Sequence, residues 1–130
     1  MSDFPAPERT LLNGPYWEAL EAGRLVHQRC HACGHAWLPA RAECPECLRA
    51  DWGWTEASGR ARLISWVVYH VAFHDWFKPR LPYNVAVVEL EEGPRLLTNI
   101  VGGAALRIEM PLQLVIEREA GVALARFRPA

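Results

Sequence analysis

The chain has 130 residues, of which 51% are hydrophobic and 22% charged, so it is a globular protein of one domain or of two small ones that share an interface. Its formal net charge of -1 argues against a general binder of polyanions such as nucleic acid. The sequence shows neither a signal-peptide pattern nor a run of about 20 apolar residues that would span a membrane. It therefore predicts a cytoplasmic protein without a membrane partner.

The N-terminal region predicts one short helix followed by two strands. Pro15 suits the first turn of a helix, and Gly23 suits the left-handed residue that ends one. Trp17 and Leu20 are three residues apart, so they lie on one helix face, which we expect to pack against the rest of the protein. Strands are expected at residues 24–29 and 36–39.

Four cysteines follow in two Cys-x-x-Cys turns, Cys30 with Cys33 and Cys44 with Cys47, separated by ten residues. Four thiolates brought together in this way form a tetrahedral site that suits Zn²⁺. Cytoplasmic cysteines stay reduced, which favours metal binding over disulfides. Iron bound by four thiolates has the same geometry, so the spacing leaves iron, or no metal at all, as alternatives.

Several other side chains near the cysteines need an explanation. His31 and His35 are able to replace a thiolate ligand, but with four cysteines present we expect both to be exposed turn residues. Trp37, Trp52 and Trp54 lie in or beside the same segment. Core packing or an interface is the simplest use of so many indole rings.

From Gly59 onward the pattern changes to β-strands. Residues 60–72 are rich in β-branched and aromatic side chains on both faces, which predicts a long coiled strand that is buried on two sides. Two hairpins are expected, one from residues 83–91 and 94–101 and one from residues 112–117 and 122–128, each across a turn that contains glycine. Five strands in this order favour a small Greek-key barrel of the OB type, although periodicity alone leaves an SH3-like barrel open.

The order of several short motifs resembles a known family that joins a rubredoxin-like zinc ribbon to an OB-fold and occurs beside thiolase-type enzymes of acyl-CoA metabolism. The motifs are Tyr16–Leu20, Cys30–Gly34, Cys44–Cys47, Pro82–Tyr83, Val87–Arg95, Met110–Pro111 and Phe127–Pro129. The chain departs from the family pattern at Leu48 and Glu109, where glycine is usual, and at Ala40, where proline is frequent. These departures affect loops and leave all four cysteines in place.

The resemblance implies a mainly β protein with two parts. Residues 1–58 would hold the short helix and the zinc ribbon, and residues 59–130 the five-stranded OB-fold barrel. It also implies a structural role for Zn²⁺ at Cys30, Cys33, Cys44 and Cys47. The implied function is that of a non-catalytic accessory subunit. It would bind a thiolase-like enzyme (a thiolase or a retro-aldolase acting on acyl-CoA, including steroid side-chain acyl-CoA) and help to form the acyl-CoA channel of a hetero-oligomer.

The segment at residues 73–83 would connect the first two barrel strands, where OB-folds often contact ligands. It places aromatic rings beside two cations, which suits the adenine ring and phosphates of acyl-CoA and also suits a protein partner. The resemblance favours partner contact over direct contact with CoA. The candidate ligand-binding residues are His74, Trp76, Phe77, Lys78, Arg80 and Tyr83.

The sequence also bears on two other functions. Catalysis by the chain alone is not expected, because His74 and Asp75 are adjacent and point apart, and no nucleophile motif is present. The alternative function is that of a single-stranded nucleic-acid-binding OB-fold protein, in which Arg60, Arg62, Lys78 and Arg80 form one basic patch. The acidic overall balance disfavours it, so no nucleic-acid partner is predicted.

Overall fold

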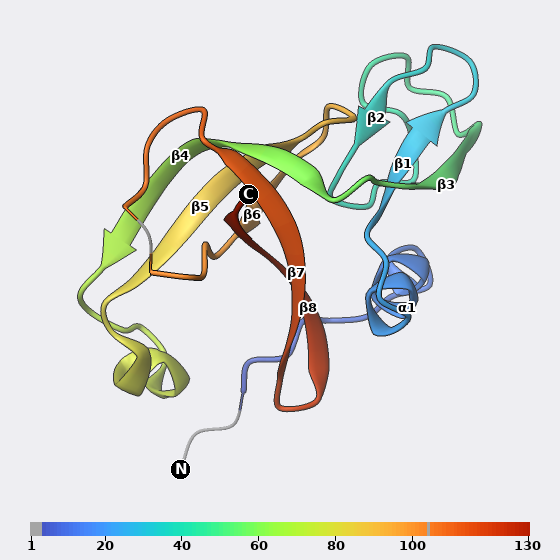
Figure 1. Ribbon diagram of the computed structural model, residues 1–130. Helices are drawn as coiled ribbons and strands as arrows, with labels where there is room; N and C mark the ends of the chain where they lie inside the picture. Colours follow the sequence, from blue (N-terminus) through green and yellow to red (C-terminus); the bar gives the residue numbers. More distant parts are fainter. Residues whose placement is uncertain (1–3, 104) are drawn as a thin grey trace.

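The computed structural model describes residues 4–103 and 105–130, which form one α-helix, one 3-10 helix and two small β-sheets (Figure 1). The predicted mainly β class, with a helix, a zinc ribbon and an OB-like barrel in that order, is confirmed. The elements are α1 (Gly14–Glu21), β1 (Val26–Cys30), β2 (Ala36–Trp37), β3 (Trp52–Glu56), β4 (Arg60–Tyr69), η1 (Asp75–Arg80), β5 (Tyr83–Leu90), β6 (Arg95–Thr98), β7 (Pro111–Glu119) and β8 (Val122–Pro129).

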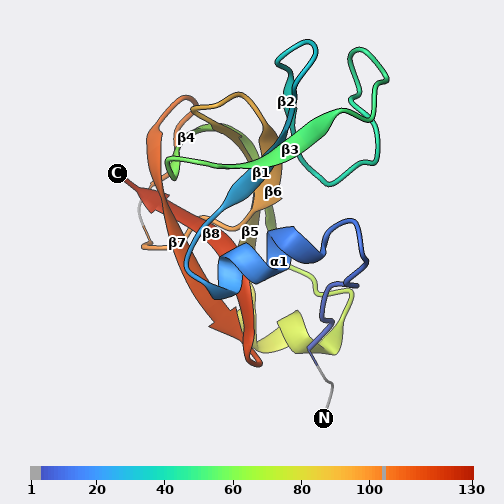
Figure 2. The ribbon, with the colours of Figure 1, turned by 90° about the vertical axis from the view of Figure 1, so that its right-hand side faces the viewer.

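The helix α1 begins and ends where the sequence predicts. Pro15 stands in its first turn, and Gly23 follows its end with a φ of 84°. Leu20 is buried, and Glu21 accepts a hydrogen bond from the backbone N–H of Ala123 at 3.2 Å. Arg118 pairs with the same carboxylate at 2.7 Å. These contacts hold α1 against the β7–β8 hairpin, as Figure 2 shows from the side.

The first sheet has the strand order β2-β1-β3 and carries the cysteine turns. Its third strand, Trp52–Glu56, pairs antiparallel with β1 and was not predicted from the sequence. Gln28, fully buried in β1, accepts from the N–H of Arg41 and donates to the carbonyl of Arg41, both at 2.8 Å. This amide clamp fixes the loop between the two cysteine turns beside a small buried cluster of Cys30, Trp37 and Cys44.

The second sheet has the order β6-β5-β4-β7-β8 and curls into the barrel. A parallel bridge between Ile100 and Phe127 brings its two ends together, and the N–H of Val101 donates to the carbonyl of Phe127 at 2.8 Å. In the barrel, β6 is the third strand and β8 the fifth. Parallel contact between β8 and the residues just after β6, together with both expected hairpins, is the arrangement of an OB-fold. Leu20 and Leu25 pack into the same core as Phe127. The division into residues 1–58 and 59–130 therefore stays a prediction.

The prediction that the first barrel strand is buried on two sides is wrong. Within β4 only Leu63 is buried, and Val67 is 54% exposed. The reason is that β7 begins at Pro111 and pairs with β4 only at residues 60–62. Beyond this point β4 has β5 alone as its paired strand, and because β6 joins β5 only at residues 86–89, residues 67–69 of β4 and 83–85 of β5 form a two-stranded end (Figure 1). The strand ends at Tyr69, earlier than residue 72.

In the part of the chain that the structure describes, no helix combines the length and the apolar composition needed to cross a membrane.

Candidate metal centre and ligand grooves

The four cysteines meet at one point of the ribbon. The four Sγ atoms all lie within 4.8 Å of one another. The Sγ–Sγ distance is 3.6 Å for Cys30–Cys47 and also 3.6 Å for Cys33–Cys44. A tetrahedron with Zn–S bonds of about 2.3 Å has edges of about 3.8 Å. The sulfur atoms are thus arranged as a zinc ribbon requires. Cys30 and Cys44 are buried, while Cys33 faces solvent.

Both cysteine turns are built in the same way. The N–H of Gly34 donates to the carbonyl of Cys30 at 3.0 Å, and the N–H of Leu48 donates to the carbonyl of Cys44 at 2.8 Å. Gly34 has a φ of 78° and Leu48 a φ of 65°, so each turn ends in the left-handed region that favours glycine. This geometry explains why glycine is usual at position 48. The turn forms here in spite of the strain of a leucine.

Backbone N–H groups aimed at the sulfur atoms favour thiolates. The N–H of Cys33 lies 3.5 Å from Sγ of Cys30 and is the largest of several contacts that together lower the pKa of Cys30 to about 6. Burial opposes ionisation of Cys44, but the N–H groups of Cys47 and Glu46, together with the neighbouring thiols, outweigh it and lower its pKa as well. The N–H of His35 favours ionisation of Cys33, but burial and the neighbouring sulfur atoms raise the pKa of Cys33 to about 12, as expected for thiolates crowded together without a cation. Metal binding requires deprotonated cysteines, so the turns prepare the site for a cation.

The two histidines beside the cysteines have other contacts. His31 is exposed, as expected, and its Nδ1 lies 2.9 Å from a carboxylate oxygen of Asp51. His35 is only half-buried and stacks on Trp37 with ring centroids 6.1 Å apart. Among the described residues, the group of side chains placed to hold a metal ion consists of the four cysteines and includes neither imidazole.

The predicted ligand residues lie on and around η1, and only some of them come together. Phe77 and Tyr83 pack with ring centroids 5.3 Å apart, and Tyr69 stacks on Tyr83 at 5.4 Å. His74 packs edge-on against Phe77 at 6.3 Å, and its Nδ1 accepts a hydrogen bond from the N–H of Trp76 at 3.1 Å. The aromatic rings therefore form one cluster at the end of the β4–β5 hairpin.

The two cations of this segment are engaged within the chain. Arg80 lies over the ring of Trp76, 4.2 Å from its centroid, and pairs with Glu119 at 3.5 Å. Lys78 pairs with Asp75 at 2.8 Å on the surface. Arg60 and Arg62, by contrast, stand at the opposite end of the long β4–β5 hairpin. The four cations considered for a nucleic-acid patch are therefore divided between its two ends.

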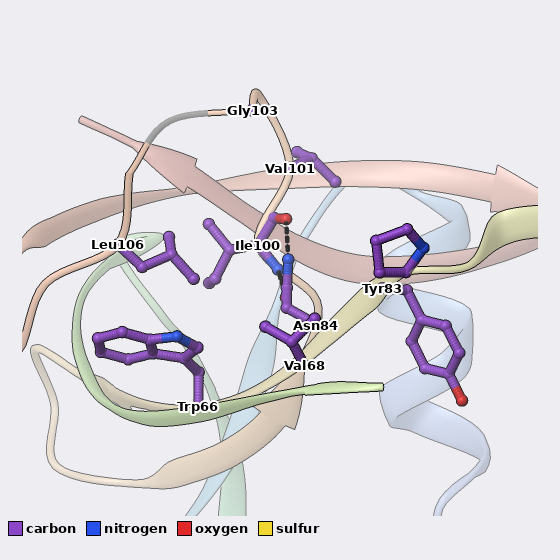
Figure 3. A pocket seen from close by; sticks show the side chains of 9 residues that line it. Trp66, Val68, Tyr83, Asn84, Ile100, Val101, Gly103 and Leu106 are labelled. Atoms are coloured by element: carbon purple, nitrogen blue, oxygen red, sulfur yellow. Dashed lines mark hydrogen bonds between the residues drawn. The ribbon is translucent and has the colours of Figure 1, made fainter. Parts of the chain in front are cut away.

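Two grooves lie on either side of Asn84 and Ile100. The first, which we call the Trp66 groove, measures about 340 Å³, and Trp66, Val68 and Leu106 line it alone (Figure 3). The second, which we call the Arg80 groove, measures about 390 Å³. Its distinctive lining residues are Phe77, Arg80, Asn99, Glu119 and Arg126. Of the six predicted ligand residues, Phe77, Arg80 and Tyr83 line the Arg80 groove.

The wall between the grooves depends on residues that the sequence reasoning missed. Asn84 donates through Nδ2 to the carbonyl of Ile100 at 2.8 Å, and its Oδ1 accepts from the N–H of Ile100 at 2.7 Å (Figure 3). Asn99 donates to the carbonyl of Asn84 at 2.5 Å. Asparagine is disfavoured in strands. The position of Asn84 in the mainly apolar strand β5 was therefore the one sequence signal that this residue has a special role.

A third depression, of about 760 Å³, lies where the helix, the ribbon and the barrel meet. Trp17 lines it from α1, Leu38 from the ribbon and Leu97 from β6. The sequence predicted an apolar helix face at Trp17 but gave no signal for this cleft, because its walls come from segments far apart in the chain.

Comparison with known proteins agrees with this architecture. A zinc-ribbon family, described as "ChsH2, rubredoxin-like zinc ribbon domain", matches residues 17–53. A second, "ChsH2, C-terminal OB-fold domain", matches residues 54–117. A solved chain described as "Ltp2-ChsH2(DUF35) aldolase" is 39% identical, with a TM-score of 0.84 over 95% of this chain and 98% of that one. The chain belongs to the ChsH2 (DUF35) family.

Relatives of known source widen the view of this ChsH2 family. A "probable enoyl-CoA hydratase alpha subunit" of Thermomonospora curvata is 40% identical over 129 residues, which cover 97% of this chain and 40% of that protein. A "DUF35 domain-containing scaffold protein" of Methanocaldococcus jannaschii is 38% identical over 59% of this chain and 55% of its own length. The chain thus spans less than half of the length of the first of these curated relatives and little more than half of the second. A DUF35 structure from Sulfolobus solfataricus, 15% identical with a TM-score of 0.68 over 92% of this chain and 86% of that one, shares the fold.

Proposed function

We propose that the protein is a non-catalytic accessory subunit of a thiolase-like enzyme that acts on acyl-CoA, through thiolysis or a retro-aldol cleavage. The observation that carries this proposal is the similarity, along 95% of the chain, to the chain described as "Ltp2-ChsH2(DUF35) aldolase". The name "scaffold protein" given to archaeal relatives supports the same role. The substrate would include steroid side-chain acyl-CoA among other acyl groups.

The polar side chains that line the grooves are bonded to other groups of the chain, which favours a structural rather than a catalytic role for them. Arg80 and Arg126 are both paired with Glu119, and Asn84 is bonded to backbone. Groups held in such pairs shape a wall, whereas an acid–base catalyst needs a proton-transfer site open to the substrate. The reacting groups would belong to the partner enzyme.

At the ribbon we propose a structural Zn²⁺ bound by Cys30, Cys33, Cys44 and Cys47. When bound, the ion supplies the cross-link that a small segment cannot obtain from apolar burial. The backbone N–H groups of the two turns hold the sulfur atoms in place for it. The ion would thereby fix the ribbon to which α1 and the barrel are joined.

We also propose that the Arg80 groove receives part of the acyl-CoA while the partner enzyme completes the channel. Phe77 and Tyr83 offer ring faces, and Arg80 and Arg126 offer guanidinium groups. His74, Trp76 and Lys78 do not line this groove in the described structure, so they would contribute through the surface of η1. The resulting assembly would be a cytoplasmic hetero-oligomer.

Co-expression with a thiolase-like enzyme of acyl-CoA metabolism from the same organism tests the proposal. We expect a complex that survives size-exclusion chromatography and has higher acyl-CoA activity than the enzyme alone. A monodisperse lone protein that ignores the enzyme but binds single-stranded oligonucleotides with a steep salt dependence would favour the alternative function instead.

Contact with acyl-CoA needs a separate titration of the assembled complex. Arg80→Gln should weaken acyl-CoA binding by about tenfold, because a charge-assisted bond is lost. Arg24→Gln is the matched control, since Arg24 is also an exposed arginine in an ion pair, with Glu56, and does not line the groove. Equal affinities of the two variants would show that the Arg80 groove does not hold the ligand.

A further inference from the structure

Beyond Leu63, the edge of β4 that faces away from β5 is open. Among the described residues 4–103 and 105–130, the last backbone hydrogen bonds on the side of β4 away from β5 join Leu63 to Met110 at 3.1 Å and Glu109 to Leu63 at 2.8 Å. The strand runs on to Tyr69 with β5 as its pairing strand. We call residues 64–73 the distal arm. Its open edge is a template for pairing with another strand.

Most side chains of the distal arm are apolar, and most of them are exposed to solvent. Val67 is 54% exposed and Phe73 is 87% exposed. The other large apolar residues exposed there are Val68, Tyr69 and Val71. Apolar residues gathered in this way mark an interaction surface on a soluble protein.

The charge pattern separates the distal arm from the rest of β4. Arg60 pairs with Glu91 and Arg62 pairs with Glu89, both at 2.7 Å, whereas residues 63–73 contain no Asp, Glu, Lys or Arg. Natural edge strands usually carry charges that prevent pairing, and this one does not. An uncharged edge is complementary to an uncharged apolar protein surface. Nucleic acid and anionic membranes need cations instead.

We propose that the distal arm is the surface on which the thiolase-like enzyme docks. The enzyme would cover Val67 and Phe73 with an uncharged apolar surface and pair a strand with the open edge of β4. The proposal rests on the proposed function and specifies its interface. Trp66 and Val68 also line the Trp66 groove (Figure 3). A partner on the arm therefore also forms a wall beside that groove.

Binding measurements with lysine variants of the full chain test this surface. Val67→Lys and Phe73→Lys place a charge in the proposed apolar contact. Each should weaken binding of the enzyme by at least about tenfold, and the double variant should abolish the complex on size exclusion. Leu11→Lys is the matched control, because Leu11 is 101% exposed and precedes α1. Circular dichroism melts should show that all variants keep the fold.

Hydrogen exchange of the complex tests strand pairing separately from side-chain contact. Amides of residues 64–69 should exchange at least about tenfold more slowly when the enzyme is bound. Lysine variants that bind as tightly as Leu11→Lys, with unchanged exchange in the arm, would overturn the inference and leave the proposed function standing. A wild-type chain that never binds the enzyme would overturn both. Lysine variants that only dissociate a homodimer would assign the arm to a second copy of this chain.

Discussion

The ribbon and the barrel are stabilised in different ways. The described barrel core has twelve buried residues, from Leu20 to Phe127, whereas the ribbon cluster has only Cys30, Trp37 and Cys44. Segments of fewer than about 40 residues rarely bury enough apolar surface to fold alone. The difference shows that apolar burial specifies the barrel, while the ribbon depends on four thiolates and the Gln28 clamp.

Removal of the metal should break the ribbon and spare the barrel. Apparent zinc-binding energies in small ribbons are about 10–16 kcal/mol, so chelation should expose Trp37 and Trp52 and shift their fluorescence to longer wavelength. Methyl signals of Leu63 and Val88 in the barrel should remain dispersed in NMR spectra. Metal analysis provides the control. A metal-free chain with unchanged tryptophan fluorescence would contradict the assigned structural role.

Truncation of Phe127 should destabilise the barrel and spare the metal site of the ribbon. Phe127 is fully buried and lies at the parallel bridge that closes the barrel, so Phe127→Ala should lower the free energy of unfolding by about 3–5 kcal/mol in urea denaturation. Bound zinc per chain should stay the same. Phe73→Ala, at an exposed site, is the control and should change stability by less than about 0.5 kcal/mol. Loss of zinc in Phe127→Ala would mean that the two parts fold as one unit.

The sequence predicted local features well because their causes are local. Cysteine spacing defines the metal centre, and a glycine turn defines each hairpin. The missed strand β3 contains Trp52, Gly53 and Trp54, and glycine weakens a strand pattern. The burial of β4 was misjudged because it depends on where β7 begins, at Pro111. The Asn84 clamp was missed because its partner, Ile100, lies sixteen residues away in sequence.

Non-glycine residues with a left-handed backbone occur in both parts of the protein, and their replacement by glycine should have smaller effects on stability. Leu48 has a φ of 65° at the end of a cysteine turn, and Glu109 has a φ of 67° before β7. Leu48→Gly should stabilise the ribbon by about 0.5–1 kcal/mol, because relief of strain exceeds the added entropy of the unfolded chain. Glu109→Gly should gain less, because it also removes the ion pair with Arg62. Equal gains in urea denaturation would show that this pair contributes nothing.

The smallest expected effect concerns Glu89, which lies between Arg62 and Arg95 on the barrel. Hydrogen bonds from Arg62 and then Arg95 hold the pKa of Glu89 below its ordinary value of 4.5. A carboxyl group with a lowered pKa stabilises the folded state above its unfolded pKa, and this stabilisation is lost as the pH falls through the folded value. Glu89→Gln should therefore be slightly less stable than wild type at pH 7, with a difference that disappears in acid. Glu43→Gln, at an exposed ribbon site, should show no such convergence in melts taken across the pH range. A difference for Glu89→Gln that persists at the lowest pH would mean that packing, rather than charge, is what this carboxylate contributes.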